Sequence, residues 1–212
     1  MAGNPRLLLW RLLAGENWTW SDGITKGIGP GISITADDDA TVLTPSTWMP
    51  QVGGTGITQL QRWKNPGGGG NTMEQNLIQI WMHPYAQEGS GYRPQIIIGP
   101  TKTISTKNLI IGSNPLMEIH RSVQVRVLTR DWDAQELGFT LDGDNTRSKL
   151  DSSIRSIIEA NLSNPDGTGA FWYVVVNDVG TQSDTVQSPE AIPLYRTAIQ
   201  IEVAYFEGPT VG

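Results

Sequence analysis

Apolar and polar positions alternate along residues 195–205, where every second position carries a tyrosine, threonine, isoleucine or valine. Arg196, Gln200 and Glu202 occupy intervening positions. Residues 123–127 repeat the pattern, with valine at every second position. Successive side chains of a strand point to opposite faces of its sheet. Both segments are therefore predicted to be strands with one apolar face.

An amphipathic helix is predicted between these strands, over residues 146–162. Its N-terminus is indicated by the turn-forming segment Asp142–Asn145, and its end by residues 164–167, Asn-Pro-Asp-Gly. Asp151 and Arg155 stand four residues apart on the polar face. The apolar face comprises Leu150, Ile154, Ile157, Ile158 and Leu162.

A continuous apolar run at residues 171–176 follows the helix and is typical of a central strand. The succession strand–helix–strand–strand predicts an α+β fold, an antiparallel sheet with one main amphipathic helix packed on one face. The other sheet face would carry Arg126, Arg196, Gln200 and Glu202. We expect that face to meet water, a channel or a neighbouring subunit.

The first half of the chain has weaker periodicity. A short helix is predicted to begin near Pro5 and to end at Gly15. Alternation at residues 32–35 and an apolar run at 77–82 predict strands, and the tetraglycine at 67–70 predicts a flexible tether.

Two β-branched runs at residues 96–98 and 109–111 flank a polar segment and predict a long hairpin whose tip carries Lys102 and Lys107. We interpret the chain, residues 1–212, as a single domain. Its parts are an N-terminal helix (1–16), a loop-rich β insertion with glycine-rich loops (17–95), the hairpin (96–119) and the α+β core (120–208).

Composition narrows the classes of function. The net charge of −6 argues against a basic surface that grips nucleic acid. The chain has no cysteine, which excludes disulfides and thiolate metal sites. Its N-terminal apolar run, Leu7–Trp10, is interrupted by Arg11 and is far shorter than the roughly 20 residues that span a bilayer. We therefore expect no membrane segment.

Three acidic patterns invite a cation interpretation. Asp142, Gly143 and Asp144 resemble the start of a calcium loop, but the sixth and twelfth positions hold arginine and serine instead of glycine and glutamate. A capped turn is preferred there, and a solvated acidic turn at residues 37–39. Glu118 and His120 share one strand face but lack a third ligand, so two unrelated polar residues are preferred.

The sequence contains no phosphate-binding G-x-x-x-x-G-K-[ST] loop and no G-x-S-x-G nucleophile elbow. Gly27, Gly29 and Gly31 do not form a dinucleotide-binding G-x-G-x-x-G pattern. We predict a protein that is not an enzyme, with no catalytic residue, no cofactor and no metal.

Four tryptophans, Trp18, Trp20, Trp48 and Trp63, lie in glycine- and proline-rich surroundings. Exposed aromatic residues of this kind stack on sugars or anchor protein interfaces. Packing over the sheet is the preferred interpretation. Either interpretation places large apolar area in the irregular part of the chain, which favours assembly with other subunits.

The order of elements resembles the tail-terminator or tail-completion proteins of long-tailed phages and archaeal tailed viruses. The resemblance involves the short leading helix 5–14, the hairpin 96–111, the strand 122–130 and the helix 146–162. It continues through the strands 171–176 and 195–206.

This resemblance implies a structural subunit of the virion that forms a ring, expected to be a hexamer. The ring would cap the tail tube and join it to the head connector and neck proteins. Genomic DNA would pass through without specific binding, because affinity for DNA depends on lysine and arginine contacts with phosphates. The protein would be assembled in the host cytoplasm and reside in the virion. Lys102 and Lys107 would reach an adjacent subunit.

Two alternatives remain open. The first is another virion part, a tail-tube, neck or baseplate subunit. The second is a carbohydrate-binding or adhesion module that uses the four loop tryptophans.

Overall fold

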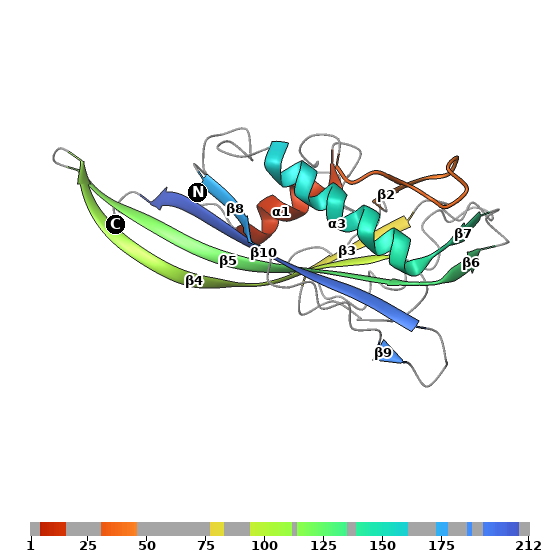
Figure 1. The fold of residues 1–212 in the computed structure, drawn as a ribbon. Helices are drawn as coiled ribbons and strands as arrows, with labels where there is room; N and C mark the ends of the chain where they lie inside the picture. Colours follow the sequence, from red (N-terminus) through yellow and green to blue (C-terminus); the bar gives the residue numbers. More distant parts are fainter. Residues whose placement is uncertain are drawn as a thin grey trace, which may run out of the picture.

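The computed structural model shows a strand-rich α+β fold in which two helices lie on one face of a long, twisted sheet (Figure 1). The predicted α+β class is confirmed. The prediction of an antiparallel sheet is wrong in part, because two of its strand pairs are parallel. The structure describes residues 5–15, 31–45, 77–82, 94–111, 114–134, 139–160, 173–177, 186–187 and 193–207.

Helix α1 (Pro5–Ala14) begins and ends where the sequence predicts. Proline suits the first helical turn, whose amide groups have no partner within the helix. Gly15 follows the last turn at a φ of 77°, the left-handed conformation in which helices commonly end. Leu9, Trp10 and Leu13 are buried against the sheet. The predicted helix is therefore confirmed over its described residues.

Three short strands form the edge of the sheet beside α1. They are β1 (Ile34–Thr35), β2 (Val42–Pro45) and β3 (Leu77–Met82). β1 and β2 are antiparallel, whereas β2–β3 and β3–β4 are parallel. Parallel neighbours need long connections, and here the chain runs through residues 46–76 and 83–94 between them.

Strands β4 (Gln95–Ile111) and β5 (Asn114–Arg130) form a continuous antiparallel hairpin. The sequence correctly predicts a long hairpin here but places its turn wrongly. The polar segment between the two β-branched runs continues β4, and the last pair of the hairpin is Ile111 with Asn114. Lys102 and Lys107 therefore lie along the strand and not at the tip. Polarity alone does not mark a turn, because a strand that projects into solvent is also polar.

Two further short strands, β6 (Trp132–Ala134) and β7 (Phe139–Leu141), pair with each other after β5. Trp132 and Phe139 meet edge to face with ring centroids 5.8 Å apart. This ribbon leads directly into helix α3 (Gly143–Ala160). It lies at the end of the molecule opposite to the hairpin turn (Figure 1).

Helix α3 buries Thr146, Leu150, Ile154 and Ile158, and Ile157 packs against the same cluster. The predicted apolar face is confirmed for these residues, while Leu162 lies outside the described part of the chain. A fully buried isoleucine side chain stabilises the fold by about 1.5–3 kcal/mol relative to an exposed one. The helix is therefore held on the sheet mainly by this single stripe.

The last strands are β8 (Tyr173–Asn177), β9 (Val186–Gln187) and β10 (Pro193–Glu207). β10 lies between β5 and β8, and β9 pairs with the start of β10. The prediction that residues 171–176 form the central strand is wrong, because β8 pairs with β10 alone among the described strands. A continuous apolar run indicates burial on both faces but does not specify which neighbours a strand acquires.

The two faces of the sheet differ. The helix-covered face carries the main core, to which β5 contributes Val123, Val125 and Val127. The opposite face was expected to be polar, yet it includes a small buried apolar cluster. Arg126, on the same face, is only partly exposed. This second cluster consists of Trp81, Ile97, Leu128 and Leu194.

Candidate functional site

Two surfaces are candidates for a functional site, because each exposes charged or apolar side chains. They lie at opposite ends of the molecule (Figure 1). The first surrounds the N-terminus of α3. Asp142 caps this helix, because its Oδ1 accepts a hydrogen bond from the amide of Asn145 at 2.9 Å. Its carbonyl oxygen accepts the Thr146 amide at 2.9 Å. The predicted capped turn is confirmed, and such a cap contributes about 1 kcal/mol.

Gly143 joins the helix to the end of β5. Its amide donates to Asp131 Oδ1 at 2.8 Å, and its carbonyl oxygen accepts the Thr129 hydroxyl at 2.5 Å. A Cβ atom at position 143 would lie 2.6 Å from the carbonyl carbon of Arg130 and 2.6 Å from Tyr195 Cδ2. Glycine is required here because the helix approaches the strand backbone too closely for any side chain.

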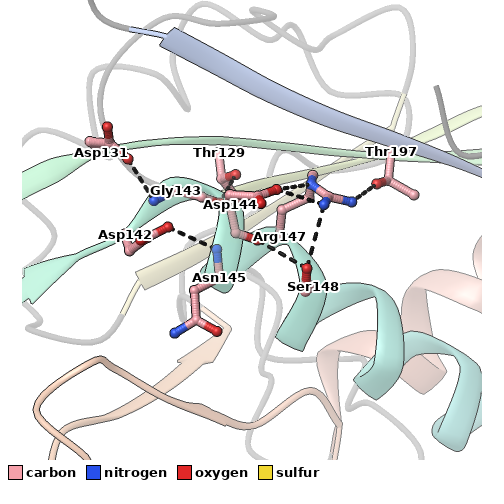
Figure 2. A network of polar contacts seen from close by, with 9 residues as sticks. All are labelled: Thr129, Asp131, Asp142, Gly143, Asp144, Asn145, Arg147, Ser148 and Thr197. Atoms are coloured by element: carbon pink, nitrogen blue, oxygen red, sulfur yellow. Dashed lines mark hydrogen bonds and ion pairs between the residues drawn. The ribbon is translucent and has the colours of Figure 1, made fainter. Parts of the chain in front are cut away.

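Arg147 ties the first turn of α3 to β10. Its Nε and one terminal nitrogen donate to Asp144 Oδ1 at 2.9 and 2.6 Å. The other terminal nitrogen donates to the Thr197 hydroxyl at 2.6 Å. Figure 2 shows the guanidinium group of Arg147 between Asp144, Ser148 and Thr197. The bonds to Asp144 and Ser148 lie within the first turn of α3, whereas the bond to Thr197 crosses to β10. Arg147 therefore fixes the start of the helix on the strand.

Asp37 connects the β1–β2 turn to the same helix end. Its carboxylate accepts hydrogen bonds from the amide of Asp142 and from the side-chain amide of Asn145. Lys149 Nζ lies 3.5 Å from Asp37 Oδ1 and donates to the carbonyl oxygen of Thr35 at 3.0 Å. These contacts span more than 100 residues of sequence. The interpretation of Asp37 as part of a solvated acidic turn is therefore wrong.

Asp38 and Asp39 retain the solvated interpretation, since both are exposed. Asp38 closes the turn by accepting hydrogen bonds from the Thr41 hydroxyl at 2.6 Å and from the Thr41 amide at 2.9 Å. These bonds lower the pKa of Asp38, the hydroxyl contributing most. Asp39 adopts a positive φ of 53°. Within the described residues, no group of three or more histidine or acidic side chains is placed to hold a metal ion.

Negative charge accumulates at this end of the molecule. The pKa of Tyr195 is raised, first by burial and then by the charges of Asp131, Asp142 and Asp144. Arg147 forms an ion pair with Asp144 here, and Lys149 forms one with Asp37. We call this surface the acidic end, which comprises Asp37, Asp38, Asp39, Asp131, Asp142 and Asp144.

The second surface is the free part of the β4–β5 hairpin. β3 pairs with β4 only as far as Ile98, so among the described strands residues 99–111 have no partner on that edge. Side chains from Lys102 to Asn108 are all exposed. We call residues 101–111 and 114–120 the hairpin arm. It extends beyond both helices (Figure 1).

Exposed apolar side chains lie on the hairpin arm. Ile110 is 81% exposed and Ile104 is 48% exposed, and Met117 stands diagonally across from Ile110 on β5. Single exposed apolar residues are ordinary, but an unpaired strand edge that also carries them promotes association with another chain. The register irregularity between Thr103 and Ser105 locally interrupts this edge.

Lys102 and Lys107 lie opposite Ser122 and Glu118 in the register, on the sheet face that points away from the helices. Neither ammonium group forms a salt bridge with the described residues. The hairpin arm therefore presents two exposed lysines on one face, where Glu118 contacts His120, and on its other side the apolar group formed by Ile110 and Met117.

Glu118 and His120 share a strand face as predicted, and they meet directly. His120 Nε2 lies 2.6 Å from Glu118 Oε1. No third ligand joins them among the described residues, so the pair acts as a local polar contact. The other histidine, His83, lies outside the described part of the chain.

A groove of about 650 Å³ separates α3 from the β1–β2 segment. Serine and threonine hydroxyls dominate its wall, and Lys149 is the charged residue that lines it. Because Lys149 is already bonded to Thr35 and Asp37, the groove offers hydroxyl groups but no unengaged charge.

The predicted interaction residues divide between described and undescribed parts of the chain. Lys102 and Lys107 lie together on one face of the hairpin arm. Trp18, Trp20, Trp48 and Trp63 lie outside the described residues.

Sequence reasoning missed the contact of Arg121 with Tyr205, in which the guanidinium carbon lies 5.5 Å from the ring centroid. Tyr205 was assigned to a strand, whereas Arg121 lies just before the strand predicted at residues 122–130. The pairing of β5 with β10 in this register brings the two side chains together.

The sequence matches no protein-family model and none of the curated proteins. In the part of the chain that the structure describes, neither helix has the length and apolarity needed to cross a membrane.

Proposed function

We propose that the protein is a structural subunit of a tailed virion that assembles with copies of itself into a ring. The observation that carries this proposal is the hairpin arm. A strand edge more than ten residues long, with exposed Ile104 and Ile110, is costly for a protein that remains alone. Such an edge is useful when it is covered on assembly.

The proposal includes a strand–helix–strand–strand core formed by β5, α3, β8 and β10. Its support is that α3 packs against the three strands of this succession, with Ile154 and Ile158 in the shared core. The order of these elements along the chain is the basis of the resemblance to tail-terminator and tail-completion proteins.

In this role the ring is a hexamer that caps the tail tube, stops its growth and joins it to the head connector. The protein acts without catalysis or cofactor. A net charge of −6 per subunit suits a passage through which DNA moves without binding, because phosphate contacts with lysine and arginine create affinity. A ring whose inner wall is predominantly basic would contradict this part of the proposal.

The test is native mass spectrometry of the purified full chain together with electron microscopy of the same sample. We expect a closed ring of six subunits with a central passage. The ring should also stop polymerisation of the matching tail-tube protein when both are mixed. A protein that stays monomeric at high concentration would exclude the ring, and a ring that fails to stop tube growth would favour another virion part.

A further inference from the structure

The hairpin arm and the acidic end have complementary properties. Lys102 and Lys107 form no salt bridge with described residues, and they lie on a strand edge that no described strand covers over residues 99–111. At the acidic end, Asp38 and Asp39 are exposed and pair with no cation among the described residues.

The two surfaces cannot meet within one molecule. The hairpin arm projects from one end, and α3 begins at the other end beside the β6–β7 ribbon (Figure 1). Opposite charges at opposite ends favour contact between different copies of the chain. A contact between two different patches is heterologous, and repetition of such a contact gives closed rings or open filaments.

We propose that the hairpin arm of one copy docks on the acidic end of the next copy, with Lys102 and Lys107 facing Asp38 and Asp39. This assignment rests on the proposed ring and identifies the surfaces that would form it. The occupant of the hairpin arm is then a second copy of this chain, and no other protein is required.

The apolar side of the hairpin arm would contribute affinity to this contact that the charge pairs do not supply. A neighbour that reaches the free edge of β4 meets the lysines on one face of the arm and Ile110 with Met117 on the other. Burial of exposed apolar area supplies affinity, whereas the charge pairs orient the contact and make it sensitive to salt.

The test uses five charge variants of the full chain, four double variants and one that combines two of them. Lys102→Gln/Lys107→Gln neutralises the arm, and Asp38→Asn/Asp39→Asn neutralises the acidic end. Asparagine retains a turn-forming acceptor at position 38 and tolerates the positive φ at position 39. Ser152→Glu/Ser156→Glu and Ser152→Lys/Ser156→Lys are matched controls on exposed positions of α3. They change the net charge of −6 by the same two units in each direction, to −8 and −4.

The readout is the dissociation constant of the assembly, measured by analytical ultracentrifugation over a range of protein concentrations. Each neutralised variant should raise it about three- to tenfold relative to its matched control, since two exposed ion pairs are lost. The combined variant, neutral at all four positions, should dissociate no more readily than either double variant, because the same pairs are already lost. Raising the salt from about 0.05 to about 0.5 M should weaken only the wild type and the controls.

The outcomes separate this assignment from the proposed function. If the protein forms a closed ring and neither neutralised variant changes its dissociation constant, the assignment is wrong but the ring function is still supported. Losses that multiply in the combined variant also overturn it, because the two surfaces then meet different partners. Open chains that respond to the variants support the assignment and contradict the ring function. A wild type that remains monomeric overturns both.

Discussion

The two ends of this protein differ in whether their polar groups have partners within the fold. At the N-terminus of α3, polar groups of Asp37, Asp142 and Arg147 already have hydrogen-bond partners within the fold. Along the hairpin arm, side chains from Lys102 to Asn108 remain exposed and one strand edge has no described partner. A polar cluster that satisfies itself positions a helix, whereas an unsatisfied edge is available to another chain.

This comparison predicts that substitutions near α3 act on stability, and that substitutions on the hairpin arm act on association. The largest expected effect is that of Ile154→Ala. Ile154 is fully buried in the main core, so the change leaves a cavity and should lower the free energy of unfolding by about 2–5 kcal/mol. Urea denaturation followed by circular dichroism measures it. A loss below about 1 kcal/mol would show that α3 is not held by its apolar stripe.

Gly143→Ala should have the next largest effect and lower the free energy of unfolding by about 1–3 kcal/mol. The new Cβ would overlap the backbone of Arg130 and the ring of Tyr195. Ser152→Ala, at an exposed position of the same helix, is the control and should leave stability nearly unchanged. The same denaturation experiment compares the two variants. Equal stability of both would contradict the close approach of α3 to the end of β5.

Asp142→Ala should cost about 1 kcal/mol through loss of the cap on the Asn145 amide. Asp142→Asn retains an oxygen acceptor and should recover most of the loss. Thermal unfolding of the wild type, Asp142→Ala and Asp142→Asn at one pH ranks their stabilities. If alanine and asparagine were equivalent, the cap would contribute nothing and the acidic end would lose its structural role.

The smallest effect on stability is expected for Ile110→Thr on the hairpin arm. Ile110 is 81% exposed, and threonine has a comparable preference for strands, so the free energy of unfolding should change by less than about 0.5 kcal/mol. If the hairpin arm docks on a neighbour, self-association should nevertheless weaken. Unfolding at a dilution where the protein is monomeric separates the two quantities. A large loss of stability in the monomer would show that the hairpin arm packs on its own chain.

Local sequence signals predicted helix α3 and its N-terminal turn well, but they did not predict the β6–β7 ribbon beside it. The helix face of Leu150, Ile154 and Ile158 and the capped turn at Asp142 both follow from spacing and residue type. The contact of Asp37 with this turn did not, because the two segments are separated by more than 100 residues. A carboxylate in a polar turn gives the same local pattern whether it faces water or another segment.

The hairpin arm shows the same limit in another form. The β-branched runs at 96–98 and 109–111 correctly indicated strand structure, and the polar segment between them was interpreted as a turn. Periodicity reports the environment of each side chain, and a strand that leaves the body of the protein has none of the burial that produces alternation. The position of the turn depended on pairing with β5, which is a property of two segments together.

The sequence by itself therefore determined the two helices, the strands with a clear apolar pattern, and which face of α3 and β10 is apolar, because these properties depend on neighbouring residues. It did not predict the short strands β2, β6, β7 and β9. Only the tertiary structure decided that β10 lies between β5 and β8, that β2, β3 and β4 run parallel, and that six aspartates gather at the end remote from the hairpin arm. Strand order, register and the meeting of distant charges arise from long-range packing, and no local pattern encodes them.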